Sequence, residues 1–84
     1  MRSIKDILAD VEVITPQLIT AFSKKQVDEF NEKSGRFTNL MQELLEHGDA
    51  LEEYAAEIAN LISPPAILLS DRSMVQKVAR KLKL

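Results

Sequence analysis

The feature that most constrains this chain is an apolar residue at every seventh position through its central segment. The interval holds for Phe30, Phe37, Leu44, Leu51 and Ile58. Because seven residues make nearly two turns of an α-helix, these five side chains share one helical face. Further apolar residues flank this face: Leu40, Tyr54 and Leu61 on one side, and Val27, Met41, Ala55 and Ile62 on the other. A stripe of this width predicts packing inside a helical bundle rather than the narrow seam of a long coiled coil.

Two isolated glycines lie in this segment, and one of them leaves its continuity open. The heptad phase runs through both glycines without a slip, so we predict an unbroken helix across Gly35. Gly48 is followed by Asp49 and Glu52, which have the spacing of a capping box for a new helix. If the helix is continuous, it is about 60 Å long. If it breaks at Gly48, the two pieces form an antiparallel hairpin.

The N-terminal part of the chain predicts a first helix that begins at Ser3. Ser3 and Asp6 form a capping box, and apolar residues then recur at helical spacing. We expect Thr15–Pro16 to end this helix, or to kink it before one further turn. Ser23 and Gln26 form a second capping box, which is predicted to open the central segment.

The C-terminal part is predicted to leave the helical body at its prolines. Ser63–Pro64–Pro65 is expected to end the central helix, with residues 64–69 extended and Ser70 or Asp71 capping a last short helix. That helix is amphipathic, with an apolar arc and a basic arc. The predicted fold is therefore an all-α bundle of three to four helices. It is a single domain with an acidic body over 1–63 and a basic segment over 64–84.

The chain offers few residues for catalysis or metal binding. It has no cysteine and one histidine, and its glycines stand alone. We therefore expect no catalytic residue, no metal site and no cofactor. His47 is interpreted as a partly buried histidine near a helix end, with a pH-sensitive interface residue as the alternative. Charges at Lys5, Asp6 and Asp10 argue against a signal peptide, and the longest apolar run, 66–69, is too short to span a bilayer. A cytoplasmic protein is expected.

The charge is unevenly distributed along the chain. Residues 1–62 carry six basic and twelve acidic residues, whereas residues 63–84 carry five basic residues and one acid. The basic tail has four possible roles: docking on the acidic body, binding a partner protein, binding nucleic acid, or lying on an anionic membrane. The apolar residues 66–69 need cover from a protein surface, which favours the first two roles over nucleic acid.

These features predict a non-enzymatic protein–protein interaction module: an adaptor, chaperone or assembly scaffold that forms a homo-oligomer, with a dimer favoured. A small nucleic-acid-binding regulator is the alternative. The plan is similar in shape to small bacterial or phage assembly factors, such as secretion chaperones and capsid scaffolds. The predicted self-association seam is Phe30, Phe37, Leu40, Met41, Leu44, Leu51, Tyr54, Ile58 and Leu61. The predicted partner-binding residues are Ile67, Leu68, Leu69, Arg72, Val75, Lys77, Val78, Arg80, Lys81 and Leu82.

Overall fold

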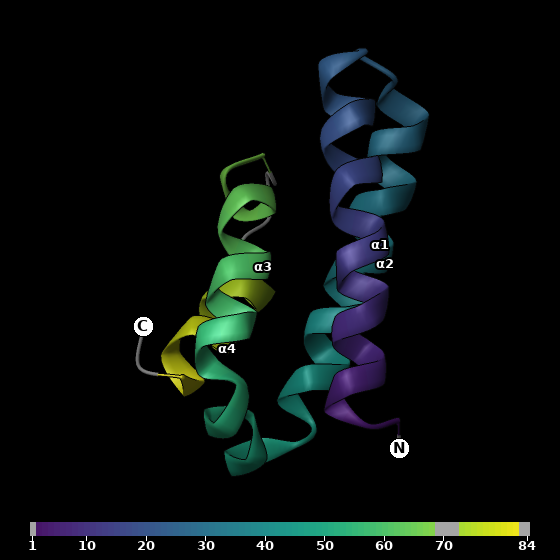
Figure 1. Ribbon diagram of the computed structural model, residues 1–84. Coiled ribbons are helices and arrows are strands. Elements are labelled where there is room, and N and C mark those ends of the chain that lie inside the picture. The colour runs from purple at the N-terminus through teal and green to yellow at the C-terminus, as the bar shows by residue number, and fades with distance from the viewer. Residues whose placement is uncertain (1, 69–72, 83–84) are drawn as a thin grey trace.

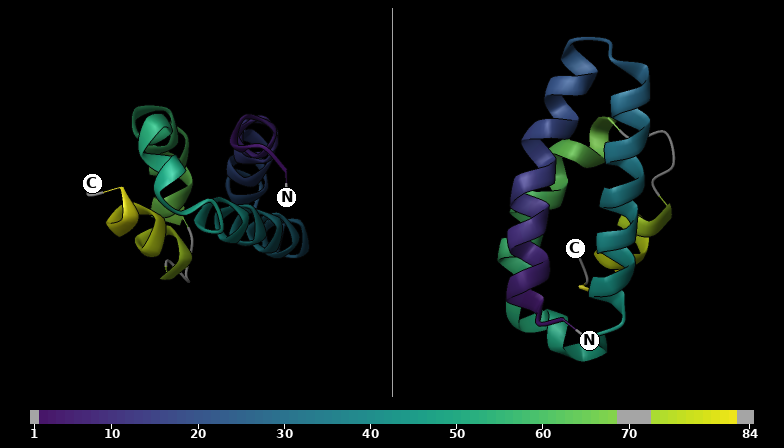
Figure 2. Two further views of the ribbon diagram at one scale, coloured as in Figure 1. Left: turned by 90° about the horizontal axis from the view of Figure 1, so that it is seen from below. Right: turned by 90° about the vertical axis from the view of Figure 1, so that its right-hand side faces the viewer.

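The computed structural model describes the backbone of residues 2–68 and 73–82, and the side chains of residues 2–62 and 74–82. Over these ranges the chain is an all-α bundle, as predicted (Figure 1). Its elements are α1 (Ile4–Ser23), α2 (Val27–Leu45), the 3₁₀-helix η1 (Gly48–Tyr54), α3 (Ala55–Leu68) and α4 (Ser73–Lys81). Helices α1 and α2 form a long antiparallel hairpin, and α3 and α4 pack beside it, leaving the end that holds the α1–α2 turn uncovered (Figure 2).

Helix α1 begins as predicted and continues further than predicted. The Ser3 hydroxyl accepts a hydrogen bond from the Asp6 backbone N–H at 3.1 Å, which caps the first turn. Pro16 lies inside the helix, so the predicted end at Thr15–Pro16 is wrong. Proline removes the bond to the carbonyl of Glu12, but both residues are exposed, so water can bind that carbonyl. The apolar stripe of α1 then gains a further buried residue, Leu18.

The turn between α1 and α2 uses Ser23 differently from the prediction. Ser23 is the last residue of α1 and does not cap α2, which begins at Val27 without a side-chain cap. Lys25 takes a left-handed conformation with φ of 58°. Gln26 N donates to the Ala21 carbonyl at 2.9 Å, and Lys25 N donates to the Phe22 carbonyl at 3.1 Å. These two bonds form a Schellman motif, which ends α1 and leaves Ser23 within its last turn.

The structure resolves the open question at the two glycines. Helix α2 runs through Gly35, as predicted, and ends at Leu45. Gly48 has φ of +61° and starts η1, so the central segment is broken here. The heptad phase survives the break because Leu51 of η1 and Ile58 of α3 enter the same core as Leu44, and all three are fully buried. An unbroken phase therefore does not require an unbroken helix.

The prediction that Pro64 and Pro65 end the helix is wrong, because helix α3 contains both prolines. It passes through Pro64 and Pro65 and ends at Leu68, so residues 64–68 are helical rather than extended. The two prolines remove only the bonds to the carbonyls of residues 60 and 61, and Asn60 is exposed to solvent. The predicted boundary between body and tail, at 63/64, lies inside this helix. The proposed caps at Ser70 and Asp71 lie outside the described residues.

One apolar core joins all of the elements. Helix α1 supplies Ile4, Ile7, Leu8, Val11, Ile14 and Leu18; α2 supplies Phe37, Leu40, Met41 and Leu44; η1 and α3 supply Leu51, Ile58 and Ile62; and α4, with the residue that follows it, supplies Val75, Val78 and Leu82. No charged or polar residue among those described is buried. The C-terminal helix therefore contributes to the core of the body. Docking on the body was one of the four roles considered for the tail, and the buried residues of α4 fit that role.

Alanine substitutions at the two glycines test whether the central segment breaks at Gly48 and is continuous at Gly35. We predict that Gly48→Ala lowers the free energy of unfolding by about 1–2 kcal/mol, because an L-residue is strained at φ of +61°. Gly35→Ala should raise it by up to about 1 kcal/mol, since Gly35 is helical and a Cβ there meets no atom within 4 Å. Urea unfolding followed by circular dichroism measures both. Equal effects of the two changes would contradict the assigned break.

A second pair of substitutions tests how two serine hydroxyls, one on α2 and one at the start of α1, affect stability. The Ser34 Oγ is buried on α2 with no hydrogen-bond partner in the described structure. We predict that Ser34→Ala raises the free energy of unfolding by about 1 kcal/mol, because it removes an unsatisfied hydroxyl. Ser3→Ala should lower it by about 1 kcal/mol through loss of the cap. Denaturant unfolding of both variants checks the opposite signs, and a destabilised Ser34→Ala protein would mean that the hydroxyl has a partner.

Candidate protein-binding surface

The described residues show no grouping typical of a metal site or a membrane span. No three His, Cys, Asp or Glu side chains come together within the described ranges in a way that could hold a metal ion. Within the same ranges, every helix is too short or too polar to cross a bilayer.

Most of the predicted self-association seam lies inside the single chain. Phe37, Leu40, Met41, Leu44, Leu51 and Ile58 are buried, whereas Phe30, Tyr54 and Leu61 are half-buried and pack against the core. Helix α1 and helix α4 provide the cover that the sequence alone could not assign. The seam residues therefore do not form a free stripe, and only its first residue, Phe30, lies next to an exposed apolar surface.

The predicted partner-binding residues of the tail are also partly buried and partly exposed. Val75, Val78 and Leu82 are buried, so they are core residues rather than an exposed docking face. Lys77 and Arg80 are exposed. Lys81 is half-buried and donates to Asp49 Oδ1 at 2.8 Å, and this bond raises the pKa of Lys81. Leu69, Arg72 and the side chains of Ile67 and Leu68 lie outside the described residues.

Among the described side chains, the largest group of exposed apolar residues is at the closed end of the α1–α2 hairpin. We call it the hairpin-tip patch and define it as Ile19, Phe22, Val27 and Phe30. Phe22 is 52% exposed and Val27 is 67% exposed, while Phe30 is half-buried. The rings of Phe22 and Phe30 lie with centroids 5.8 Å apart and planes tilted by 52°. A hollow of about 490 Å³ opens here, lined by Ala21, Phe22, Ser23, Lys25, Gln26, Val27 and Phe30.

The patch continues the buried face of the hairpin. Phe22 follows buried Leu18 by one turn of α1, and Phe30 precedes buried Phe37 by two turns of α2. The buried half of this face is covered by α3 and α4. The 14 residues of α3 span about 21 Å and the 20 residues of α1 about 30 Å, so the hairpin extends past its cover (Figure 1). The patch is exposed because the covering helices end before the hairpin does.

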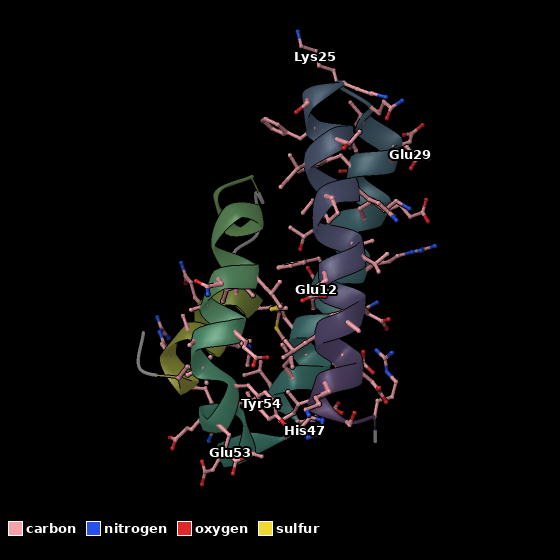
Figure 3. The ribbon with its side chains drawn as sticks, in the orientation of Figure 1. Glu12, Lys25, Glu29, His47, Glu53 and Tyr54 are labelled. Atoms are coloured by element: carbon pink, nitrogen blue, oxygen red, sulfur yellow. The ribbon has the colours of Figure 1, made fainter. Side chains whose placement is uncertain are left out.

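Charged residues lie near the hairpin tip, and of these Lys25 lines the hollow of the patch. Lys24 and Lys25 come from the turn, and Asp28 and Glu29 come from the first turn of α2; all four are exposed. Figure 3 shows Lys25 at the extreme end of the hairpin and Glu29 on the side of α2. Ser23, Lys25 and Gln26 therefore give the apolar hollow a polar border, a combination found in many protein–protein interfaces.

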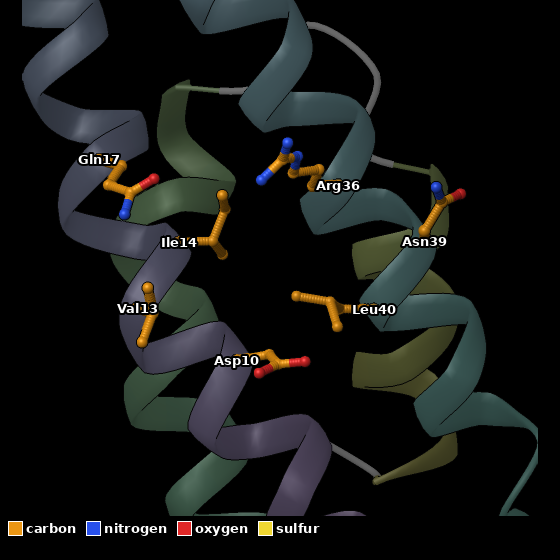
Figure 4. A pocket seen from close by; sticks show the side chains of 7 residues that line it. All are labelled: Asp10, Val13, Ile14, Gln17, Arg36, Asn39 and Leu40. Atoms are coloured by element: carbon orange, nitrogen blue, oxygen red, sulfur yellow. The ribbon is translucent and has the colours of Figure 1, made fainter. Parts of the chain in front are cut away.

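A second hollow lies on the side of the hairpin away from α3 and α4 (Figure 4). It has a volume of about 400 Å³ and is lined by Asp10, Val13, Ile14 and Gln17 of α1 and by Arg36, Asn39 and Leu40 of α2. Val13 is its exposed apolar residue, at 59%. The lining is otherwise mostly polar, so this groove offers much less apolar area than the hairpin tip.

At the opposite end of the molecule, Arg2 makes polar contacts with side chains of α1 and α2 and with His47. Its guanidinium bonds to Glu43 at 3.1 Å (Nε to Oε1) and 2.6 Å (Nη2 to Oε2), and it also pairs with Asp10. His47 Nε2 lies 2.8 Å from the Arg2 carbonyl oxygen and donates to it. The Arg2 guanidinium lowers the pKa of Glu43, and the pKa of Arg2 is raised by Glu43 and Asp10. These contacts join the start of the chain to the end of α2.

Comparison with known proteins gives no relative for this chain: no family model, no curated protein and no solved structure matches it.

The Arg2–Glu43 bond predicts a dependence of stability on acid. Because the folded-state pKa of Glu43 lies below its ordinary value of 4.5, its contribution is complete above 4.5 and is lost as the pH falls through the lowered value. We predict that wild-type protein loses more thermal stability on acidification than Arg2→Ala does. Arg36→Ala, which removes the exposed pair with Glu32, serves as the control and should behave as wild type. Parallel acid responses of wild type and Arg2→Ala would contradict the assignment.

Proposed function

We propose that this chain is a non-enzymatic protein–protein interaction module that docks through the hairpin-tip patch. The single observation that carries the proposal is the concentration of exposed apolar side chains there. Of the four large hydrophobic residues exposed among those described, Ile19, Phe22 and Val27 belong to the patch, and Val13 is the fourth. A small bundle gains no stability from leaving an aromatic side chain and two aliphatic ones in water, so such a cluster is typical of a docking site.

The partner that fits this patch is a protein that presents an apolar helical face. The same face of the hairpin already packs against α3 and α4 over its other half, so its spacing suits a helix. Occupation of the patch would extend the existing core rather than create a new one. In the cell this activity would be that of an adaptor, chaperone or assembly scaffold in the cytoplasm.

Nucleic-acid binding through the tail receives less support. Lys77 and Arg80 are the exposed cations of the described part of α4, while Lys81 is bound to Asp49. Phosphate affinity grows with the number of cations that contact the nucleic-acid backbone, so the pairing of Lys81 with Asp49 works against phosphate binding. The chain as a whole also has a net charge of −2.

The proposal is tested by placing a photoreactive benzoylphenylalanine at position 22 and, as a control, at the exposed Val13 position, in cells that produce the protein. We predict protein adducts from position 22, several-fold fewer from position 13, and loss of the adducts when Val27→Asp is added. Nuclease treatment should leave the adducts unchanged. Equal adducts from both positions, or adducts that contain nucleic acid, would overturn the proposal.

A further inference from the structure

Gly48 is the one point at which the described backbone between Val27 and Leu68 leaves a right-handed helical path. Glu46 and His47, which precede it, have φ/ψ of −65°/−21° and −76°/−13°, close to the values of right-handed helices. The 3₁₀-helix η1 then leads directly into α3. Gly48 has the positive φ of this stretch, +61°. Because glycine has no Cβ, it adopts left- and right-handed conformations about equally readily, so a change at this one residue can straighten the segment.

The heptad pattern fits a straight helix as well as the bent segment. A loop of arbitrary length shifts the phase of an apolar repeat, but the interval from Leu44 to Leu51 across the break is still seven residues. In a straight helix over 27–68 the apolar stripe therefore stays on one face. The 3₁₀-helix η1 has seven residues, whereas this conformation seldom exceeds four because its hydrogen bonds have poorer geometry than those of an α-helix. Conversion of η1 to α-helix removes that disadvantage.

A straightening at this position divides the molecule into two units. The first unit is the α1–α2 hairpin, and the second, which we call the η1–α4 unit, consists of η1, α3 and α4. Helix α4 moves with α3 because four residues separate the two helices and because Lys81 bonds to Asp49 of η1 at 2.8 Å. The ion pair of Arg2 with Glu43 lies within the hairpin. Both of these pairs therefore survive when the two units separate.

Apolar packing holds the η1–α4 unit on the hairpin. Six of its described side chains are buried in the common core: Leu51, Ile58, Ile62, Val75, Val78 and Leu82. A straight chain on its own would leave them, and the face of the hairpin that they cover, in water, so it does not persist as a monomer. A second straight chain removes that penalty, because the surface that fits the η1–α4 unit is the hairpin of this same chain. The closed structure thus shows which surface each unit would occupy.

We infer that Gly48 is a hinge for domain exchange: two copies straighten there, and each packs its η1–α4 unit on the hairpin of the other in a twofold dimer. In the closed monomer α3 runs back along the hairpin from the end opposite the α1–α2 turn (Figure 1). The two straight helices of the dimer therefore lie antiparallel, with both hinges near the centre and the two α1–α2 turns at opposite ends. Residues of the predicted self-association seam, such as Leu44 and Ile58, then pack between chains through contacts that the monomer already makes.

Gly48→Ala is the direct test, and Gly35→Ala is its matched control. Gly48→Ala is strained in the closed monomer and favoured in the straight helix, whereas position 35 is helical in both forms. We expect wild type and Gly35→Ala to dimerise only at roughly millimolar concentration, which is the effective concentration of two tethered units. Gly48→Ala should dimerise at least about a hundredfold more tightly, because each dimer contains two hinges. Light scattering over a concentration series measures the mass. A Gly48→Ala protein that keeps its helicity but dimerises no better than Gly35→Ala overturns the inference.

A distance measurement distinguishes exchange from contact between closed monomers. The chain has no cysteine, so Lys25→Cys, added to Gly48→Ala, carries a single spin label at the extreme end of the hairpin (Figure 3). The 19 residues of α2 span about 28 Å and separate each label from its hinge. In the exchanged dimer the two labels should therefore lie more than about 50 Å apart by pulsed electron resonance. A shorter distance between the labels of the dimer would overturn the exchange.

The hinge inference does not rest on the proposed function, because the hinge and the hairpin-tip patch lie at opposite ends of α2. Phe22→Ser, which removes the exposed ring of the patch, should leave the mass and the label distance of the Gly48→Ala dimer unchanged. Loss of that dimer in the Phe22→Ser variant would show that the contact is made at the hairpin tip, and it would overturn the inference. The adducts expected from position 22 are measured on the chain with Gly48 in place, so either proposal can fail without the other.

Discussion

The packing of α1 against the heptad stripe is the interaction on which the rest of the structure depends. Ile7, Val11 and Leu18 of α1 and Phe37 and Leu44 of α2 are fully buried against one another's helices. Each such side chain contributes roughly 1.5–3 kcal/mol when it leaves water. In a chain of 84 residues few other sources of stability exist, because there is no disulfide and the described ion pairs are exposed. The α1–α2 hairpin leaves part of its apolar surface uncovered, and η1, α3 and α4 pack on that surface and complete the same core.

The two ends of the molecule differ because the covering helices are shorter than the hairpin. At one end, Arg2 bonds to Glu43 and Asp10, His47 bonds to the Arg2 carbonyl, and Lys81 bonds to Asp49. Exposed pairs of this kind add little stability each, but they connect the residue before the Ser3 cap with α2 and the end of α4 with η1. At the other end, the apolar face continues past α3 and α4 and remains in water. The exposed apolar side chains of the tip and the buried core thus lie on separate parts of one hairpin, so that changes at Phe22 or Val27 need not disturb the core.

The differences between the expected and observed helices lie at the three prolines and at Ser23. Pro16, Pro64 and Pro65 were expected to end helices, yet α1 and α3 pass through them. A proline costs one backbone hydrogen bond and a local clash, and in α1 the burial of Leu18 and Ala21 beyond Pro16 offsets that cost. Ser23 was expected to cap α2, but the Schellman bonds to Ala21 and Phe22 already determine the turn. Local signals near the tip were therefore overridden by packing, while the cap at Ser3, with no competing contact, formed as predicted.

The sequence by itself determined the fold class, the apolar face of each helix and the poor supply of catalytic and metal-binding groups, because these depend on periodicity and residue type alone. Only the tertiary structure decided which faces cover one another. Val75, Val78 and Leu82 could have faced a partner, but they are core residues, whereas Phe22 and Val27 stand in water. Periodicity indicates which side chains favour burial, but it does not indicate where the helix that buries them ends. That depends on the relative lengths of α1 and α3 and on the left-handed turn at Gly48, which sets where η1 and α3 begin their path along the hairpin.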